Sequence, residues 1–189
     1  MKSNVEMIRS SLVALAIGAA SVGAHAASVQ VLAPGSPVTA GDSFTVSLFG
    51  YDFASLDGGG ADLSFSPALL ELTSVQVDPS WDFFSLPGEI DNATGHLTGM
   101  SFNVWGAKQG DFAIASLQFT AKASGLAAID LFGSDMFPFG SGGVEVNVAL
   151  IGAQVQINSP VPEPGTWLLM LGGLGLLGAR ASRRTTARD

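Results

Sequence analysis

Short apolar segments with a two-residue period dominate the middle of the chain. In the segment FTVSLFG, Phe44, Val46 and Leu48 alternate with other side chains, which is the pattern of a strand with one buried face. Further strand-like segments follow, and Gly, Pro, Asp or Ser interrupts them at short intervals: GADLSFSP, LLELTSVQV, HLTGMSFNVWG, DFAIASLQFTA, AAIDLFG and VEVNVALIGAQVQI. Repeated short strands with turn signals predict an all-β fold, a single antiparallel β-sandwich over residues 27–159.

The segment DFAIASLQFTA contains a shift in its apolar positions. Phe112 and Ile114 follow one phase, whereas Leu117 and Phe119 follow the other. One extra residue near Ala115 would explain the shift, so we predict a β-bulge there. The chain has no cysteine, so its stability must come from a packed core, for which about 130 residues are enough.

The body of the chain is strongly acidic. Residues 27–159 contain Lys108 and Lys122 against thirteen Asp and Glu, a formal charge of −11. A field of this sign repels phosphate backbones, and we therefore expect no nucleic-acid partner.

The first 26 residues are typical of a secretory signal peptide. Lys2 and Arg9 both precede the apolar, small-residue run SLVALAIGAASVGA. Ala24 and Ala26 then provide the small-x-small pattern that signal peptidase cleaves, which predicts a mature chain beginning at Ala27. The alternative is an amphipathic N-terminal helix, but apolar residues surround this segment on all sides. The pattern predicts an N-terminal signal helix and export.

Residues 160–189 combine a proline-rich spacer, an apolar run and a basic end. The run from Trp167 to Ala181 has 15 residues and would extend about 22 Å as a helix. That length is short of the ~30 Å hydrocarbon core of a bilayer. The run has no polar positions at helical spacing, which argues against a soluble core helix. We predict a short transmembrane helix with its arginines on the cytoplasmic side.

The stretch VPEPGTWLLMLGGLGLLGARASRR resembles a PEP-CTERM sorting signal. It has the three parts of that signal in order: a Pro-Glu-Pro motif, a short apolar segment with glycines, and a basic cluster. The matching positions are Pro162, Glu163, Pro164, Arg180, Arg183 and Arg184. The alternative is an ordinary C-terminal membrane anchor.

The PEP-CTERM resemblance implies processing by an exosortase-type membrane enzyme in a Gram-negative bacterium. The tail would hold the protein transiently at the inner membrane, and the processed protein would reach the cell surface or be secreted. Members of this family are commonly linked to exopolysaccharide and the biofilm matrix.

The stretch AGDSFTVSLFGYDFASLDGGGADLSFSPALLELTSVQV resembles the start of a cohesin-type domain. Gly41 and Asp42 form the turn that opens a strand, and Pro67 ends a later one. The stretch GDFAIASLQFTAKASGLAAIDL is similar to a later strand pair of such domains. The resemblance implies a jelly-roll or cohesin-like sandwich that contacts another protein. Cohesins bind dockerin modules through one sheet face, but no individual residues of that face correspond here.

The residues offer little for catalysis. After signal cleavage His96 is the single histidine, and the chain has no Gly-x-Ser-x-Gly motif for a nucleophilic serine. Zinc sites need clusters of His and Cys. The scattered acids are explained more simply as a solvated surface than as paired glycosidase carboxylates. We therefore expect no catalytic residues and no cofactor other than a metal ion at the acidic loop described next.

Two features suggest binding. Asp52, Asp57 and Asp62 are evenly spaced around the glycine triplet of YDFASLDGGGAD. Such oxygen ligands suit Ca²⁺, although Asp and Gly are also ordinary turn residues. Tyr51 and the two body tryptophans, Trp81 and Trp105, are either exposed rings that bind a partner or members of the core.

Two functions remain open. The first is a non-catalytic surface or matrix protein that uses a cohesin-like domain for protein contact. The second is a carbohydrate-binding sandwich that holds exopolysaccharide. A planar exposed row of aromatic rings would favour the second, whereas a flat apolar sheet face with buried tryptophans would favour the first. A hydrolase is a distant third, because it would need a cleft with two facing carboxylates.

Overall fold

A computed structural model of the protein describes residues 26–160 and 169–174. Between Ser28 and Asn158 the described chain is almost entirely β structure. Its strands are β1 (Ser28–Leu32), β2 (Val38–Thr39), β3 (Ser43–Phe65), β4 (Leu70–Val77), β5 (Phe84–Leu86), β6 (Glu89–Asp91), β7 (His96–Ala121), β8 (Gly125–Gly133), β9 (Gly140–Ser141), β10 (Val144–Glu145), β11 (Ala149–Ile151) and β12 (Ala153–Asn158). The all-β class predicted from the alternating pattern is confirmed.

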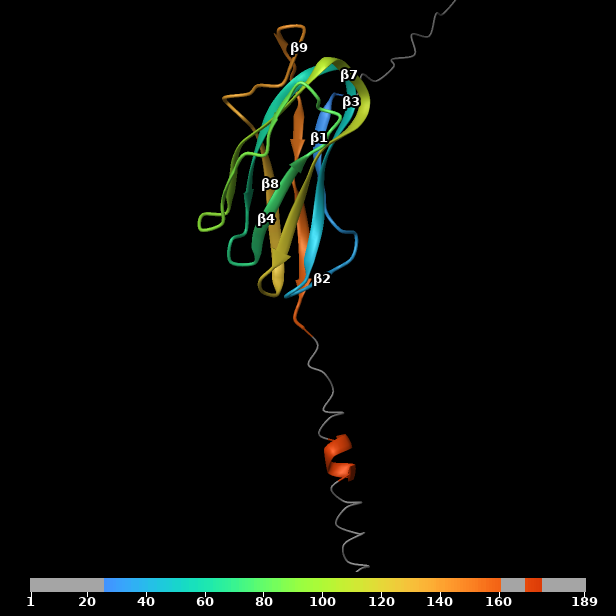
Figure 1. Cartoon of the computed structure of the whole chain (residues 1–189), viewed down its shortest axis with the longest axis vertical. Coiled ribbons are helices and arrows are strands. Elements are labelled where there is room, and N and C mark those ends of the chain that lie inside the picture. Colours follow the sequence, from blue (N-terminus) through green and yellow to red (C-terminus); the bar gives the residue numbers. More distant parts are fainter. Residues whose placement is uncertain (1–25, 161–168, 175–189) are drawn as a thin grey trace, which may run out of the picture.

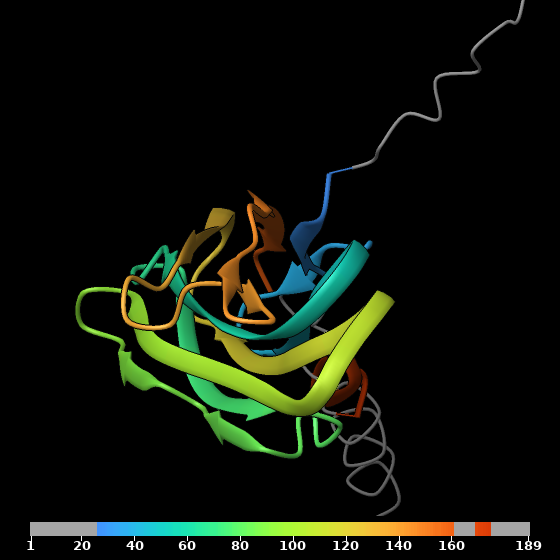
Figure 2. The ribbon, with the colours of Figure 1, turned by 90° about the horizontal axis from the view of Figure 1, so that it is seen from above.

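Two long bent strands organise the fold. The segment FTVSLFG and all but the last two residues of GADLSFSP, expected as separate strands, lie within the 23-residue strand β3. HLTGMSFNVWG and DFAIASLQFTA likewise lie within the 26-residue strand β7. β3 and β7 pair antiparallel along most of their length, with register shifts between Gly50 and Gly58 where both strands bend. Figure 2 shows the curved ribbons side by side.

The bends divide one continuous hydrogen-bonded sheet into two layers (Figure 1). In the first layer, the beginning of β3 pairs with β1 and the end of β7, and β11 and β4 extend the layer at its two sides. In the second layer, the end of β3 pairs with β8 and the beginning of β7. β12 and β2 extend this layer beyond β8, and β5 and β6 extend it beyond β7. The arrangement is a two-layered sandwich.

The predicted bulge is confirmed. Leu48 pairs with Ala115 and the next residue, Phe49, pairs with Ala113, so Ile114 has no opposite residue on β3. Ile114 and Ala115 are both buried although they are neighbours. The bulge therefore reverses the phase of β7 and keeps apolar side chains inside on both sides of it.

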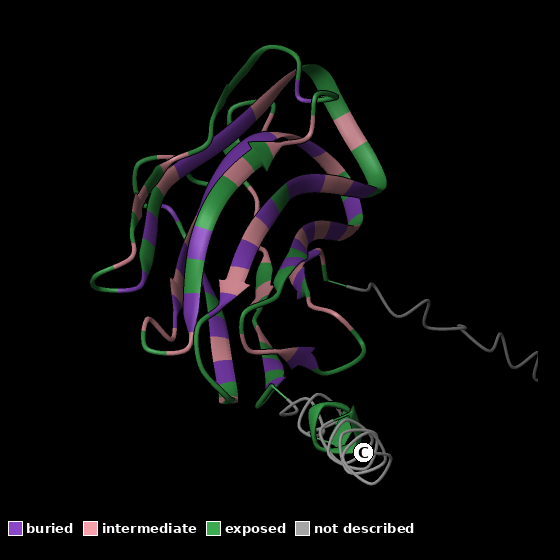
Figure 3. Ribbon diagram, turned by 60° about the horizontal axis from the view of Figure 1, so that its bottom comes forward, coloured by how far each residue is buried: buried purple, intermediate pink, exposed green. Residues whose placement is uncertain are grey.

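The core lies between the two layers. Buried and exposed residues alternate along the strands, as the striped ribbons of Figure 3 show. Aromatic rings join the layers: Phe119 stacks on Phe44 of its own layer, and Phe65 of the other layer meets Phe119 edge-on at 5.4 Å. Edge-to-face geometry is favourable for such pairs.

The predictions for the two ends of the chain lie mostly outside the described residues. Residues 169–174, within the apolar run of the tail, are helical, and their leucine and methionine side chains are exposed. In the described part of the chain, no helix has the length and apolar character needed to cross a membrane. The signal helix predicted for residues 1–26 falls almost wholly outside the described part.

Candidate functional site

The three aspartates expected to bind Ca²⁺ have separate hydrogen-bond partners. The backbone N–H of Asp52 donates to Asp111 Oδ1 at 3.0 Å, whereas the Asp57 carboxylate accepts the backbone N–H of Gly142 at 2.6 Å. Asp62 Oδ1 accepts the backbone N–H of Gly99 at 2.8 Å. Asp57 and Asp62 therefore fasten the bent part of β3 to the β9–β10 hairpin and to β7.

The structure does not bring these carboxylates together. Among residues 26–160 and 169–174, no group of three Asp, Glu, His or Cys side chains is placed to hold a metal ion. The even spacing that suggested a metal loop places Asp52 and Asp57 on a bending strand and Asp62 farther along it. Spacing along an extended chain separates side chains, whereas a compact loop would have gathered them.

The glycine triplet is a close-packing element and not a turn. Gly58, Gly59 and Gly60 are all buried within β3 and pair with Asn103, Phe102 and Ser101 of β7. A Cβ atom on Gly60 would lie 2.7 Å from the carbonyl oxygen of Met100. None of the three has a positive φ, so the glycines are required by the close approach of neighbouring segments.

Trp81 belongs to the core. It is 3% exposed and lies in the connection between β4 and β5. Its ring packs against Phe102 at 4.7 Å and Phe112 at 5.4 Å between centroids, and its Nε1–H donates to the carbonyl oxygen of Ala113. The hydrogen bond satisfies the polar edge of the indole, as burial of a tryptophan requires.

Trp105 has the opposite environment and is the exposed member of the two alternatives. It is 72% exposed on β7, and its ring lies 4.1 Å from that of Phe83, which is also more than half exposed. The two planes are inclined at 59°, so the rings form a pair but not a planar platform. Tyr51 is partly buried beside Phe49 at 5.0 Å.

His96 is the first residue of β7 and directly follows a turn. Its Nδ1 is 3.2 Å from Thr94 Oγ1, and both side chains are exposed. Asp91 closes the same turn by accepting the Thr94 hydroxyl at 2.7 Å and the backbone N–H of Ala93 at 2.9 Å. These hydrogen bonds hold the pKa of the Asp91 carboxyl below its ordinary value of 3.8, and the bond from the Thr94 side chain has the largest effect.

The Asp91 turn gives a prediction about acid stability. Because the folded pKa is lowered, the contribution of this carboxylate is present above about pH 4 and is lost as pH falls through the folded pKa. We expect Asp91→Asn to lower the melting temperature at pH 7 and the difference from the parent to shrink below pH 4. Thermal scans of both proteins from pH 7 to pH 2.5 measure this. Thr94→Val should also reduce the pH dependence, and a difference that stays constant with pH would contradict the assignment.

The outer face of β8 carries two exposed apolar side chains. Leu126 and Phe132 are both more than half exposed, and Ala128 and Asp130 lie between them on the same side of the strand. Residues at every second position of a strand share one face. The segment AAIDLFG signalled a strand, but the sequence did not show which of its two apolar sets would be buried.

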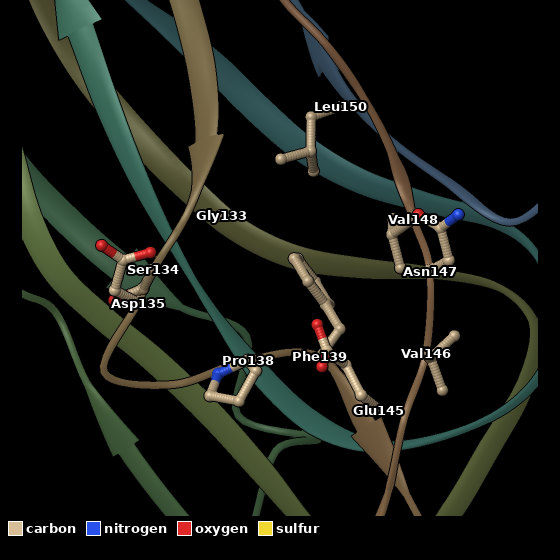
Figure 4. A pocket seen from close by; sticks show the side chains of 10 residues that line it. All are labelled: Gly133, Ser134, Asp135, Pro138, Phe139, Glu145, Val146, Asn147, Val148 and Leu150. Carbon is tan, nitrogen blue, oxygen red and sulfur yellow. The ribbon is translucent and has the colours of Figure 1, made fainter.

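A cleft of about 640 Å³ lies beside the end of β8, and Gly133, the residue after Phe132, is part of its lining (Figure 4). Its lining residues come from the end of β8, the connection to β9, and the segment from β10 to β11: Gly133, Ser134, Asp135, Pro138, Phe139, Glu145, Val146, Asn147, Val148 and Leu150. The sequence did not indicate this cleft, because its walls combine the β8–β9 connection with the segment VEVNV, and no local pattern shows that these two segments meet.

Comparison with known families finds the PEP-CTERM protein-sorting motif at residues 160–184. The chain carries a PEP-CTERM sorting signal. The motif contains the predicted Pro162, Glu163 and Pro164 together with Arg180, Arg183 and Arg184, all outside the described residues. No curated protein matches the chain.

Solved structures of cohesins resemble the body. A cohesin module from a Clostridium perfringens family 33 glycoside hydrolase matches with a TM-score of 0.56 and 17% identity, over 71% of this chain and 97% of the module. A cohesin from Acetivibrio cellulolyticus, solved in complex with a dockerin, matches with a TM-score of 0.55 and 16% identity, over 69% and 98%. A non-cellulosomal cohesin from Archaeoglobus fulgidus gives 0.52 and 16%, over 71% and 93%. The body therefore has a cohesin-like fold.

The predicted signal cleavage site borders the described part of the chain. Ala24 lies outside it, and Ala26 and Ala27 precede β1. The carbonyl oxygen of Ala27 accepts the backbone N–H of Ala149 at 2.9 Å, next to the parallel pairing of β1 with β11. Cleavage after Ala26 would leave this hydrogen bond intact.

Proposed function

We propose that this chain is an exported, non-catalytic protein that is sorted through its C-terminal signal and binds another protein through its cohesin-like body. Three units correspond to these roles: a signal peptide at 1–26, a binding domain at 27–159 and a sorting segment at 160–189. Signal peptidase and an exosortase-type enzyme process the two ends. The body then acts at the cell surface or in the extracellular matrix of a Gram-negative bacterium.

The observation that carries the binding role is the presence of two large exposed apolar side chains, Leu126 and Phe132, on the outer face of β8. Leu126 and Phe132 stand on a regular strand within a layer, where the backbone fixes their positions. Trp81 is buried in the core, and the exposed Trp105 lies at 59° to Phe83, so the two tryptophans do not form a planar platform. An exposed apolar surface rimmed by polar residues is typical of a protein contact.

The β8 surface is tested by two substitutions made together. We expect Leu126→Ser with Phe132→Ser to reduce recovery of the native partner by about tenfold, because central apolar residues contribute most of the binding free energy. Cross-linking in the producing cells, followed by mass spectrometry, measures this. Gln76→Ala with Ser116→Ala, on the other layer, should leave recovery unchanged, and equal recovery with both variants would refute the assignment.

The sorting role gives a second prediction. Changing Pro162, Glu163 and Pro164 to alanine should leave a full-length, membrane-bound form, because the processing enzyme would lack its motif while the apolar run stays. Cell fractionation and intact-mass measurement detect this form. Thr185→Ala with Thr186→Ala leaves the motif and the arginines unchanged and should mature normally. Normal maturation of the alanine variant would show that sorting does not depend on this motif.

Carbohydrate binding is the second function, and the exposed Trp105–Phe83 pair favours it. An exposed indole can stack on the apolar face of a sugar ring. Affinity electrophoresis in gels that contain the native exopolysaccharide tests this role. Retardation that Trp105→Ala abolishes would support carbohydrate binding, whereas unretarded migration of the parent protein would leave protein contact as the function.

A further inference from the structure

We propose that the cleft at the end of β8 binds a basic side chain of the partner protein. The inference rests on the proposed protein-binding role and names the chemistry that the partner brings. It is carried by four features of the cleft: its acidic rim, its apolar floor, a largely buried serine without a side-chain partner and its position in the fold.

The rim of the cleft is acidic and is not neutralised from within the described body. Asp135 and Glu145 come from separate segments and are both exposed. The two lysines of the body are engaged elsewhere: Lys108 Nζ donates to Ser80 Oγ at 2.7 Å and Lys122 Nζ donates to the carbonyl oxygen of Pro67 at 2.8 Å. Two carboxylates beside one cleft are complementary to an ammonium or guanidinium group.

The floor of the cleft is apolar. Phe139 is 6% exposed, and Val148 and Leu150 are partly buried in the wall. A lysine or arginine carries a long aliphatic stem below its charge, and the stem packs on apolar surface while the head stays polar. The combination suits a basic side chain better than a bare metal ion, since the described residues offer no group of three metal-ligating side chains here.

A largely buried serine lines the same cleft. Ser134 is 5% exposed, its backbone N–H donates to the carbonyl oxygen of Gly60, and no described residue hydrogen-bonds to its hydroxyl. In Figure 4, Ser134 and Asp135 lie on one side of the cleft and Asn147 lies on the other. An ammonium group has three donors and no acceptor, so the hydroxyl, amide and carboxylate oxygens all match it.

The position of the cleft links it to the outer face of β8. Its first lining residue, Gly133, directly follows Phe132. β9 lies at one end of the sandwich, whereas β12 ends beside β2 at the opposite end, where the chain continues into the sorting segment (Figure 1). If the protein is held by its tail, the end of the sandwich that carries the cleft therefore lies opposite the end that is attached. The charge of −11 on the body also attracts a basic partner over long range.

The inference is tested with N-acetyl-lysine amide and N-acetyl-norleucine amide as probes for the full-length protein. Both have the same aliphatic stem, and the lysine derivative alone carries the charge. We expect ligand-observed NMR titrations to show about tenfold tighter binding of the lysine derivative, as two partly exposed ion pairs can supply. Equal binding of the two probes would overturn the inference.

The site is located by a variant and a charge-matched control. Asp135→Asn with Glu145→Gln should remove the preference for the lysine derivative. Asp42→Asn with Glu71→Gln removes the same charge from residues that do not line the cleft and should keep the preference. Equal losses in the two variants would show a general effect of net charge and would also overturn the inference.

The two proposals fail in different ways. If the native partner still cross-links equally to the Asp135→Asn, Glu145→Gln variant, and neither probe is preferred, the cleft assignment is wrong while the protein-binding function stands. If the lysine derivative is preferred but the β8 substitutions leave every cross-linked protein unchanged, the cleft assignment stands and the proposed contact through β8 is wrong.

Discussion

Replacing Trp81 by alanine is expected to lower the free energy of unfolding by about 4 kcal/mol, since burial of a large aromatic side chain is lost and a cavity remains. Trp81 contacts Phe102 from one layer and Phe112 from the other, so the substitution affects the closure of the sandwich at its bent end. The carbonyl oxygen of Ala113 also loses its donor. Urea denaturation followed by circular dichroism measures the change.

Trp105→Ala is the matched control for this substitution. The Trp105 side chain is mostly exposed, so we expect this substitution to change the free energy of unfolding by no more than about 0.5 kcal/mol. If Trp81→Ala fails to fold, Trp81→Phe keeps most of the apolar volume and should be less destabilised, by about 1–2 kcal/mol. Similar stabilities of the Trp81→Ala and Trp105→Ala proteins would contradict the structure.

The sequence predicted the fold class because alternation is a local signal. Phe44, Val46 and Leu48 are buried as their two-residue period requires, and the phase shift near Ala115 located the bulge. The continuity of β3 was not predictable in the same way. Asp52 and Asp57 are turn-forming residues, and Asp52 has a φ of 57°, in the left-handed region that turns use. β3 nevertheless continues as one strand, because it pairs with β7 on both sides of these residues. Long-range pairing therefore keeps the strand continuous through a local bend.

The candidate site was less predictable than the fold. Trp81 and Trp105 are the same residue type, and their opposite environments depend on how the β4–β5 connection folds over the bend of β7. The cleft brings together Asp135, from the β8–β9 connection, and Glu145, from the short strand β10. No periodic pattern connects such residues in the sequence. The sorting signal, in contrast, was identified from Pro162 to Arg184, because its parts occur consecutively along the chain.

Gly60→Ala is expected to lower the free energy of unfolding by about 3 kcal/mol, which is the upper end for the insertion of one methyl group into a packed interior. The new Cβ would lie 2.7 Å from the carbonyl oxygen of Met100, 2.7 Å from Phe137 Cβ and 3.1 Å from Ser134 Cβ. A paired backbone oxygen cannot move away as the end of a flexible side chain can. Separation of β3 from β7 would break ladder hydrogen bonds at the bend.

Gly35→Ala separates this steric effect from the general effect of replacing glycine. No atom lies within 4 Å of a Cβ built at Gly35, and its φ is outside the left-handed region. The substitution should be neutral or slightly stabilising, because alanine restricts the unfolded chain. Urea denaturation of both variants measures the difference. Equal stabilities would show that β3 and β7 do not approach closely at Gly60, and the glycine triplet would then be an ordinary turn as its sequence alone suggests.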